Sequence, residues 1–331
     1  MRKIVALVAS AVLLVSGLTG CSSAAQNLDD ALFTGIKNQC APLVTGSTAD
    51  QITVTEKKSG KPTVKFPTPL RATVTQSKIV TEGTGPVFTG NQLINFEYQG
   101  YNARTGKLFQ SSAWNGTDNA SEVLAKPTAT GGADFCHALT GAREGSVVAV
   151  AMSPKDSHGS KPIAQIDVRK NDSLVFIFKI KKIFLPRANG KAQAPQNGFP
   201  QIVTAANGVP GVVLQDWSKP AFSKFASETL IQGYGPTLKK NDWVTVHYSG
   251  FVWSSSKTKF DSSWDKNTPA QFQLTDGQLI PGFIKALVGQ RVGSQVVAVL
   301  PPDEAYGQQE SGSIPANSTL IFVIDILGVG K

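Results

Sequence analysis

The alternation of apolar and polar positions predicts a chain made mainly of β-strands. Residues 243–250 alternate over strand length, which places one set of side chains toward a core and the other away from it. Two runs rich in β-branched residues, 295–300 and 319–326, have the composition and length of buried strands. The pattern therefore argues against a large solute-binding protein, which would need alternating strands and long helices.

One segment in the second half of the chain has the pattern of a helix. It begins at Pro281, because proline suits the first helical turn, and it ends by Gly289, because glycine is common just past a helix. Its apolar residues fall on one face, and they are Phe283, Ile284, Leu287 and Val288. One short helix against a twisted antiparallel sheet is an α+β arrangement.

The chain also repeats itself with an offset of about 150 residues. Residues 60–62 correspond to 208–210, and residues 96–100 correspond to 246–250. Three further matches follow the same order along the chain, and they join 83–86 to 233–236, 138–146 to 286–294, and 174–176 to 320–322. Five collinear matches indicate two copies of one fold.

The composition sets the boundaries of these copies. Residues 21–50 are polar and are expected to form a tether with little packing of its own. The first repeat is placed at 51–186 and the second at 200–331. Residues 187–199, which are polar and contain Gly and Pro, are expected to link them.

Four groups of residues in the second repeat resemble the FKBP-type peptidyl-prolyl cis-trans isomerases. They are 246–250, 260–263, 279–283, and 305–307 followed by Ile314, Pro315 and Phe322. Their order and spacing are similar to the family over residues 210–331. The resemblance implies two tandem FKBP-like domains, each a twisted antiparallel sheet wrapped on one short helix, with an apolar pocket between sheet and helix.

The resemblance further implies roles for nine residues of the second repeat. Phe283 would form the floor of the pocket, and Tyr248, Phe260 and Phe322 would form its walls. Leu279 and Ile280 would line the pocket and offer a backbone N–H, and Tyr306 would offer a phenol. Asp261 would be the acidic group at the rim, and Ile314 would cap the site on the late loop. Rotation about an X-Pro amide faces a barrier of about 18–20 kcal/mol, and an apolar pocket favours the less polar twisted form. Such a site requires no nucleophile, acid–base pair, metal or cofactor.

Several positions of the second repeat depart from the family pattern or have a plain structural interpretation. Lys266 stands where relatives often carry an arginine, so the support for Asp261 is expected to be looser. Ala270 replaces an aromatic residue, which predicts a wider mouth and a changed substrate preference with activity retained. Phe272 is interpreted as a core residue, and His247 as a polar or packed residue on the far side of its strand.

The first repeat has lost the polar part of the site. Gln110 takes the place of Asp261, and His158 takes the place of Tyr306. The apolar positions Tyr98, Phe109, Phe135 and Phe176 persist. We therefore expect catalysis in the second repeat, while the first repeat keeps a core or binds extended polypeptide.

The N-terminus has the features of a bacterial lipoprotein signal. Arg2 and Lys3 precede an apolar run at 4–15 that is too short to span a bilayer comfortably. The next residues, Leu-Thr-Gly-Cys, resemble a lipobox, in which Cys21 becomes the lipidated first residue after removal of residues 1–20. An ordinary signal peptide with an incidental cysteine is the alternative. Acyl chains on Cys21 would hold the exported protein at the outer face of the bacterial cell membrane.

The remaining cysteines, Cys40 and Cys136, leave two interpretations open. In an oxidising compartment they would form a disulfide that ties the N-terminal segment to the first repeat, and otherwise they are separate buried thiols. The net charge of +9 would fall by two with the signal, and the chain has no long Lys/Arg run, so the sequence does not indicate nucleic-acid binding.

The sequence thus predicts an exported, membrane-anchored prolyl isomerase that assists the folding of exported or envelope proteins. Its partners would be proline-containing polypeptides, with the macrolide inhibitors tacrolimus and rapamycin as further ligands by resemblance. The alternative is a non-enzymatic envelope chaperone or polypeptide-binding lipoprotein, and the retention of Asp261, Phe283 and Tyr306 favours the enzyme. A purely structural lipoprotein would have both pockets degraded.

Overall fold

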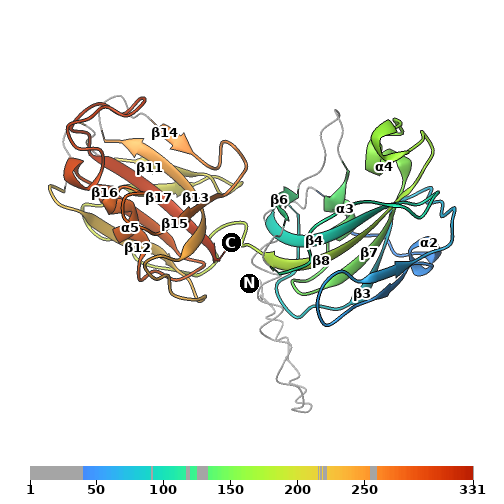
Figure 1. The fold of residues 1–331 in the computed structure, drawn as a ribbon. Coiled ribbons are helices and arrows are strands. Elements are labelled where there is room, and N and C mark those ends of the chain that lie inside the picture. The colour runs from blue at the N-terminus through green and yellow to red at the C-terminus, as the bar shows by residue number, and fades with distance from the viewer. Residues whose placement is uncertain are drawn as a thin grey trace, which may run out of the picture. The chain divides into compact units, whose positions relative to one another are not determined.

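The computed structural model describes residues 40–90, 92–116, 120–124, 133–214, 216, 218, 222–253 and 259–330. The predicted signal peptide, Cys21 and most of the predicted tether lie outside the described residues. Within the described part, no helix is long and apolar enough to cross a membrane. Two antiparallel sheets, one in each repeat, dominate the described structure, as the hydrophobic pattern predicts (Figure 1).

The sheet of the first repeat has six strands. Its order is β3 (Gln76–Thr81), β7 (Val147–Met152), β8 (Leu174–Ile183), β4 (Gln92–Asn102) and β5 (Leu108–Ser111), and β6 (Ala120–Leu124) also pairs with β4. The central strands β7 and β8 are almost entirely buried because their β-branched and aromatic side chains pack on both faces of the sheet.

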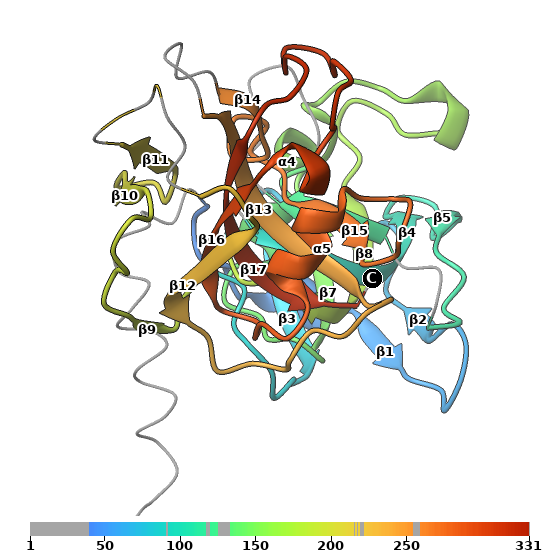
Figure 2. The same ribbon diagram turned by 90° about the vertical axis from the view of Figure 1, so that its left-hand side faces the viewer.

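The sheet of the second repeat has seven strands. Its order is β14 (Lys259–Ser262), β13 (Trp243–Val252), β17 (Leu320–Val329), β16 (Gln295–Leu300), β12 (Ala226–Gln232) and β9 (Lys191–Ala192), and β15 (Ala270–Gln273) also pairs with β13. Helix α5 (Pro281–Leu287) lies across this sheet, as Figure 2 shows.

The strand registers of the two repeats agree residue by residue. Tyr98 pairs with Phe178 in the first sheet, as Tyr248 pairs with Ile324 in the second. The edge strands agree as well, because Gln110 lies opposite Gly100 just as Asp261 lies opposite Gly250. These registers define which positions of the two repeats are equivalent.

Each sheet is covered on both faces. On one face lies a core that includes the short helix, and on the other lies a β-hairpin with its own apolar cluster. The hairpins are β1 (Thr53–Thr55) with β2 (Thr63–Lys65), and β10 (Gln201–Thr204) with β11 (Pro210–Val213). Each sheet is therefore packed between two apolar layers.

The first residues of α5 explain how closely the helix approaches the sheet. Pro281 occupies the first helical turn, as predicted, and Ile280 is the N-cap in an extended conformation. A Cβ on Gly282 would collide with the Leu300 side chain of β16. Glycine at this position therefore lets the helix pack directly on the strand.

The prediction of one short helix in each repeat was wrong for the first repeat. The first repeat contains the five-residue helices α3 (Phe135–Leu139) and α4 (Pro154–His158), and a four-residue helix, α2 (Ser47–Asp50), lies in the preceding segment. Helix α4 is too short for a periodic pattern, but it is capped at one end by Ser153, whose Oγ accepts from the Asp156 N–H. At its other end Gly159 adopts a left-handed φ of 61°. Two 3₁₀ turns complete the helical elements described, η1 (Ala164–Ile166) and η2 (Pro302–Glu304).

Two segments predicted as loose connections are packed. Two residues at the end of the predicted tether are buried in the first repeat, with Cys40 3% and Ala49 0% exposed. In the predicted linker, β9 pairs with β12, and the Ala188 N–H donates to Asp325 Oδ2 at 2.8 Å. Polar composition signalled a loop there, whereas the backbone groups complete the second sheet.

Candidate active site

A cavity of about 470 Å³ opens between the second sheet and the start of α5. It is lined by residues from β13, β14, β15, β17, the helix and the loops beside it, and these are Tyr248, Phe260, Asp261, Phe272, Gly277, Gln278, Leu279, Ile280, Pro281, Phe283, Tyr306 and Phe322. Eight of the nine residues predicted from the sequence are among them. The structure thus brings together side chains that are up to 74 positions apart in the sequence, from Tyr248 to Phe322.

The wall of the cavity is a cluster of aromatic rings in edge-to-face contact. The Phe283 and Phe322 ring centroids are 5.2 Å apart, and those of Phe260 and Phe322 are 5.6 Å apart. Tyr248 meets Phe283 at 6.1 Å with nearly perpendicular planes. Phe283 and Phe322 are only 4% and 5% exposed, so the rings are fixed by the core behind them. Such a surface offers a rigid apolar seat for a ring the size of proline.

Asp261 supplies the charge at the rim. Its carboxylate accepts a hydrogen bond from the Tyr248 hydroxyl and one of 2.8 Å from Lys266 Nζ. Burial would raise the pKa of Asp261, but the hydrogen bonds from Lys266 and Tyr248 outweigh it and hold the pKa below its ordinary value. Burial, reinforced by the Asp261 carboxylate, raises the pKa of Tyr248. The carboxylate is therefore ionised and the phenol protonated at neutral pH.

Lys266 forms an ion pair with Asp261, at the position where the family resemblance led us to expect an arginine. Its ammonium contacts one carboxylate oxygen, whereas a guanidinium can contact two. The lysine side chain is 66% exposed, so water screens this ion pair. Lys266 therefore supports Asp261 through a single contact, and the looser support expected for this carboxylate stays a prediction.

The helix entry supplies a backbone donor beside the rings. Leu279 and Ile280 line the cavity, and the Ile280 N–H makes no hydrogen bond to another described residue. Ile280 is the N-cap of α5, where intrahelical acceptors are absent. Its role as a donor to a carbonyl of a bound peptide stays a prediction.

Two predicted residues on the late loop have different fates. Tyr306 lines the cavity and is 39% exposed, which leaves its phenol accessible to a ligand. Ile314 is not among the residues that line the cavity, and its role as a cap stays a prediction. It forms a bridge with Ser311, is 4% exposed, and packs in the core cluster of the second repeat. A loop position in the sequence did not reveal this inward orientation.

Four lining residues were missed by the sequence analysis. Phe272 was interpreted as core, yet it both packs on Phe283 at 5.6 Å and faces the cavity. Gly277 and Gln278 belong to the turn that leads into α5, and Pro281 is the first residue of the helix. The strand alternation of Gln271, Phe272 and Gln273 could have indicated that the Phe272 side chain faces the helix.

On the far side of β13, His247 and Trp264 form a second contact. Their rings stack at 4.0 Å, and His247 Nδ1 lies 2.9 Å from Ser263 Oγ. Burial lowers the pKa of His247 to about 4, so the ring is neutral at pH 7. As predicted, His247 is a packed residue that faces away from Tyr248.

The equivalent region of the first repeat carries a cluster of aromatic rings. Phe135 lies 5.0 Å from both Phe176 and Phe178, and Phe178 replaces the smaller Ile324 of the second repeat. Gln110, at the Asp261 position, is exposed. His158 Nδ1 and Nε2 are occupied by the carbonyl oxygens of Lys161 and Asp172 at 2.6 and 2.8 Å. The polar constellation of the second repeat is absent from these positions.

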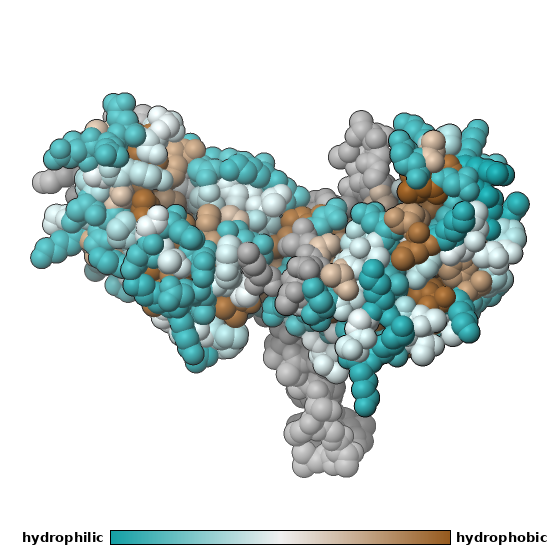
Figure 3. Space-filling view, in the orientation of Figure 1, coloured by the Kyte–Doolittle hydropathy of each residue, from teal (hydrophilic) through white to brown (hydrophobic). Residues whose placement is uncertain are grey.

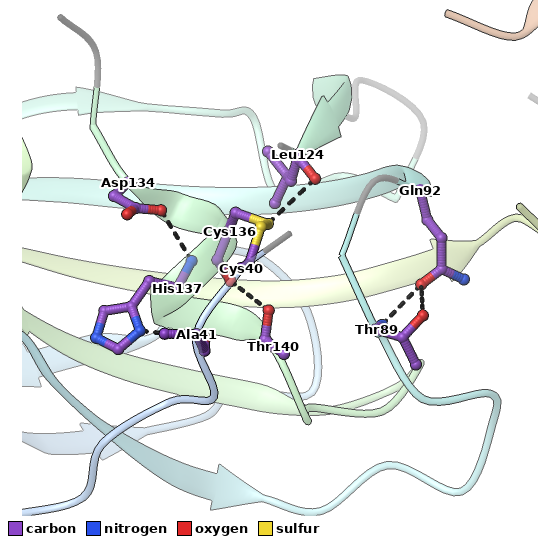
Figure 4. Close-up of a disulfide and its surroundings, with 9 residues drawn as sticks. All are labelled: Cys40, Ala41, Thr89, Gln92, Leu124, Asp134, Cys136, His137 and Thr140. Carbon is purple, nitrogen blue, oxygen red and sulfur yellow. Dashed lines mark hydrogen bonds between the residues drawn. A yellow bond between two sulfur atoms is a disulfide. The ribbon is translucent and has the colours of Figure 1, made fainter. Parts of the chain in front are cut away.

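The two cysteines left open by the sequence are joined. Cys40 and Cys136 form a disulfide with their Cα atoms 5.7 Å apart (Figure 4). Cys136 lies on α3, where the Asp134 carboxylate caps the helix by accepting from the His137 N–H at 2.9 Å. The bridge fixes the N-terminal segment to the core of the first repeat.

An antiparallel sheet wrapped on a short helix, with an aromatic cavity and one carboxylate at its rim, defines a prolyl isomerase of the FKBP class. The family model described as "FKBP-type peptidyl-prolyl cis-trans isomerase" matches residues 235–327. Across the described residues, no group of three or more His, Cys, Asp or Glu side chains could hold a metal ion.

Comparison with known proteins agrees with this class. An FK506-binding protein of Streptomyces anulatus is 38% identical over 106 residues, which cover 31% of this chain and 85% of that protein. The isomerase FkpA of Aeromonas hydrophila is 42% identical over 99 residues, which cover 30% of this chain and 35% of that protein. The crystal structure of FkpA from Escherichia coli is 29% identical, covers 40% of this chain and 52% of that chain, and gives a TM-score of 0.30.

The chain belongs to the FKBP-type peptidyl-prolyl cis-trans isomerases. The matched region of the family lies within the second repeat.

Proposed function

We propose that the cavity of the second repeat catalyses X-Pro isomerisation and that the first repeat is a degenerate FKBP-like domain without this activity. The observation that supports the proposal is the aromatic cavity with the Tyr248–Asp261 hydrogen bond at its rim. In the first repeat, the equivalent polar positions hold Gln110 and His158, and the latter is engaged by backbone carbonyls.

The geometry supports catalysis by binding the twisted amide. The planar amide is more charge-separated than the twisted one, so transfer into an apolar site costs the planar form more. Phe283 and Phe322 would hold the proline ring, while the Ile280 N–H and the Tyr306 phenol would bind flanking carbonyls. Contacts that hold the substrate in the twisted geometry lower the barrier without any covalent step.

A prolyl isomerisation assay without protease tests this assignment on the full chain. Asp261→Val and Tyr306→Phe are each expected to lower kcat/KM, whereas the first-repeat counterparts Gln110→Val and His158→Phe leave it unchanged. Circular dichroism establishes that all four variants are folded. Equal losses from both repeats would contradict the assignment to the second cavity, and a parent chain that binds proline peptides without turnover would favour the non-enzymatic chaperone.

The macrolides tacrolimus and rapamycin are proposed as ligands of the same cavity. Relatives of this chain are named FK506-binding proteins, and the aromatic lining is present here. Ala270 removes one aromatic from the mouth, so weaker binding than in aromatic-bearing members is expected. Titration calorimetry with the parent and with Tyr306→Phe measures this, and absence of heat in the parent would exclude an accessible cavity.

We further propose that the protein is exported, lipid-anchored through Cys21 at the outer face of the bacterial membrane, and assists the folding of exported or envelope proteins. The proposal rests on the apolar run at 4–15, the Leu-Thr-Gly-Cys sequence and the disulfide between Cys40 and Cys136. Cys21→Ser is expected to release the protein from the membrane fraction. Retention of that variant in the membrane would contradict the lipid anchor.

A further inference from the structure

The first repeat has an open cavity on the face of its sheet opposite the helix, at a place where the described part of the second repeat carries a tryptophan ring. This cavity has a volume of about 520 Å³ and lies between the turn of the β1–β2 hairpin and strands β4 and β8. Its lining includes Gly60, Glu97 and Ala113. The cavity lies on the other side of β4 from Tyr98, the counterpart of the active-site Tyr248.

In the second repeat, the indole of Trp264 lies at the equivalent place among the described residues. Ser112 Oγ accepts from the Tyr98 N–H at 3.0 Å, and Ser263 Oγ accepts from the Tyr248 N–H at 2.8 Å, so the next residues, Ala113 and Trp264, are equivalent. The Trp264 indole stacks on His247 and covers Gly208, where a Cβ would lie 3.1 Å from the ring.

In the first repeat this indole is missing and the turn is uncovered. Gly60, the counterpart of Gly208, is exposed, and a Cβ added to it would meet nothing within 4 Å. Ala113 is also exposed, while Trp114 beside it is buried with its indole N–H bonded to the Tyr98 carbonyl at 3.0 Å. The first repeat therefore presents a preformed slot in the position that holds an aromatic ring in the second.

The slot is also surrounded by cations that the second repeat lacks. Its lining includes four lysines, Lys57, Lys58, Lys179 and Lys181. By the hairpin and sheet registers, the corresponding residues of the second repeat are Ala205, Ala206, Asp325 and Leu327.

Two glutamates in the lining are already engaged. Glu56 accepts from Thr81 at 2.5 Å and from Lys179 at 3.4 Å, and Glu97 accepts from the Gly116 N–H at 3.0 Å. The lining thus carries four positive and two negative side chains, which leaves an excess of two positive charges. An approaching anionic group would be attracted to this surface.

We propose that this slot is a second binding site, which takes an aromatic side chain of a polypeptide whose neighbouring residues are acidic. The aromatic ring fills the space that Trp264 fills in the second repeat, and the carboxylates contact the lysines at the hairpin turn. Such a site would hold a polypeptide on the first repeat independently of the isomerase cavity, and it goes beyond the proposed catalytic function.

The test uses the full chain and a fluorescein-labelled peptide with one tryptophan between two pairs of glutamates, followed by fluorescence anisotropy. Ala113→Trp, which restores the aromatic of the second repeat, is expected to weaken binding at least about tenfold. The pair Lys57→Ala and Lys58→Ala is expected to weaken binding about two- to tenfold and to reduce its dependence on salt. The matched control, Lys155→Ala with Lys161→Ala, removes two exposed lysines outside the slot and leaves binding unchanged.

Three results would overturn the proposal. They are absence of binding to the parent chain, equal binding of a peptide with alanine in place of tryptophan, and unchanged binding by the folded Ala113→Trp variant. If Ala113→Trp does not fold, the variant with Lys57→Ala and Lys58→Ala decides. Peptide binding by this variant that is as strong as binding by the control with Lys155→Ala and Lys161→Ala would overturn the proposal. Binding of phosphatidylglycerol vesicles but not of the peptide would assign the lysines to a membrane surface and reject the polypeptide site. Unchanged isomerase activity in Ala113→Trp separates this outcome from the proposed function of the second repeat.

Discussion

The hydroxyl of Tyr248 donates to the carboxylate of Asp261 across the pair formed by β13 and β14. This hydrogen bond connects a wall of the cavity to its only lining carboxylate among the described residues. It orients the phenol along the rim while its ring contacts Phe283 and Phe322. The charge and the apolar wall therefore form one unit rather than two independent features.

A double-mutant cycle is expected to show this coupling. Tyr248→Phe and Asp261→Asn should each lower kcat/KM about three- to tenfold, because a hydrogen bond to a charged group is lost in a partly exposed site. The double variant should lose less than the product of the two, since each single change already breaks the same bond. Asp265→Asn is the control, because Asp265 pairs with Lys259 at 2.7 Å on the exposed loop. Fully multiplicative losses would show that the two groups act separately.

A glycine beside the cavity offers a matched test of the unequal repeats. A Cβ on Gly250 would collide with the Phe260 ring, and a Cβ on Gly100 would lie 2.8 Å from Phe109. Overpacking of this kind costs about 1–3 kcal/mol, so both alanine variants should be somewhat less stable. Gly250→Ala should also lower kcat/KM about tenfold because it displaces a cavity wall. Gly100→Ala should leave kcat/KM unchanged, and a similar loss in both variants would indicate that both repeats contribute to activity.

Much of the second repeat could be predicted because local and family patterns agree there. The alternation in 243–250 is observed as part of β13, and Pro281 begins α5 as expected. Ile314 could not be placed, because its orientation depends on a bridge to Ser311 that joins the loop to itself and turns the side chain inward. A loop position carries no periodicity from which burial can be read.

The slot of the first repeat was also beyond the sequence. Ala113 is an ordinary small residue until the register shows that its counterpart is Trp264. Likewise, the polar residues 187–199 indicated a linker, whereas the Ala188 N–H donates a hydrogen bond to the buried carboxylate of Asp325. In both cases the local structure depends on tertiary contacts with residues that are far away in the sequence.

Two buried titratable groups on the far face of the second sheet are expected to change the free energy of unfolding in opposite directions as the pH falls. His247 and Asp325 are register partners on β13 and β17. Burial lowers the pKa of His247 from 6.5 to about 4 and raises the pKa of Asp325 from 3.8 to about 6. Asp325 also accepts from Ala188 and Gln295 and lies near Arg187, but burial dominates.

The two groups have opposite effects on stability as the pH falls. The unfolded chain protonates His247 near pH 6.5, but the folded chain only near pH 4. The stability that neutral His247 contributes to the folded state is therefore lost as the pH falls from 6.5 to 4. The folded chain protonates Asp325 near pH 6, but the unfolded chain only near pH 3.8. The stability that Asp325 contributes to the folded state therefore grows as the pH falls from 6 to 3.8. Relative to the parent, the Tm of His247→Gln should rise as the pH falls from 6 to 4, and that of Asp325→Asn should fall. Thermal denaturation at several pH values measures this, and three parallel curves would contradict the assignment.

The disulfide is expected to stabilise the first repeat without affecting catalysis in the second. Cys40 and Cys136 are 96 residues apart in the sequence, and both are nearly completely buried. A loop of this length corresponds to about 4–5 kcal/mol in the chain-entropy model. The double variant Cys40→Ala and Cys136→Ala should therefore unfold at a lower denaturant concentration in the transition of the first repeat, while kcat/KM stays unchanged. Dithiothreitol should destabilise the parent in the same way and leave the double variant unaltered. A loss of isomerase activity on reduction would instead show that the conformation of the second cavity depends on the disulfide of the first repeat.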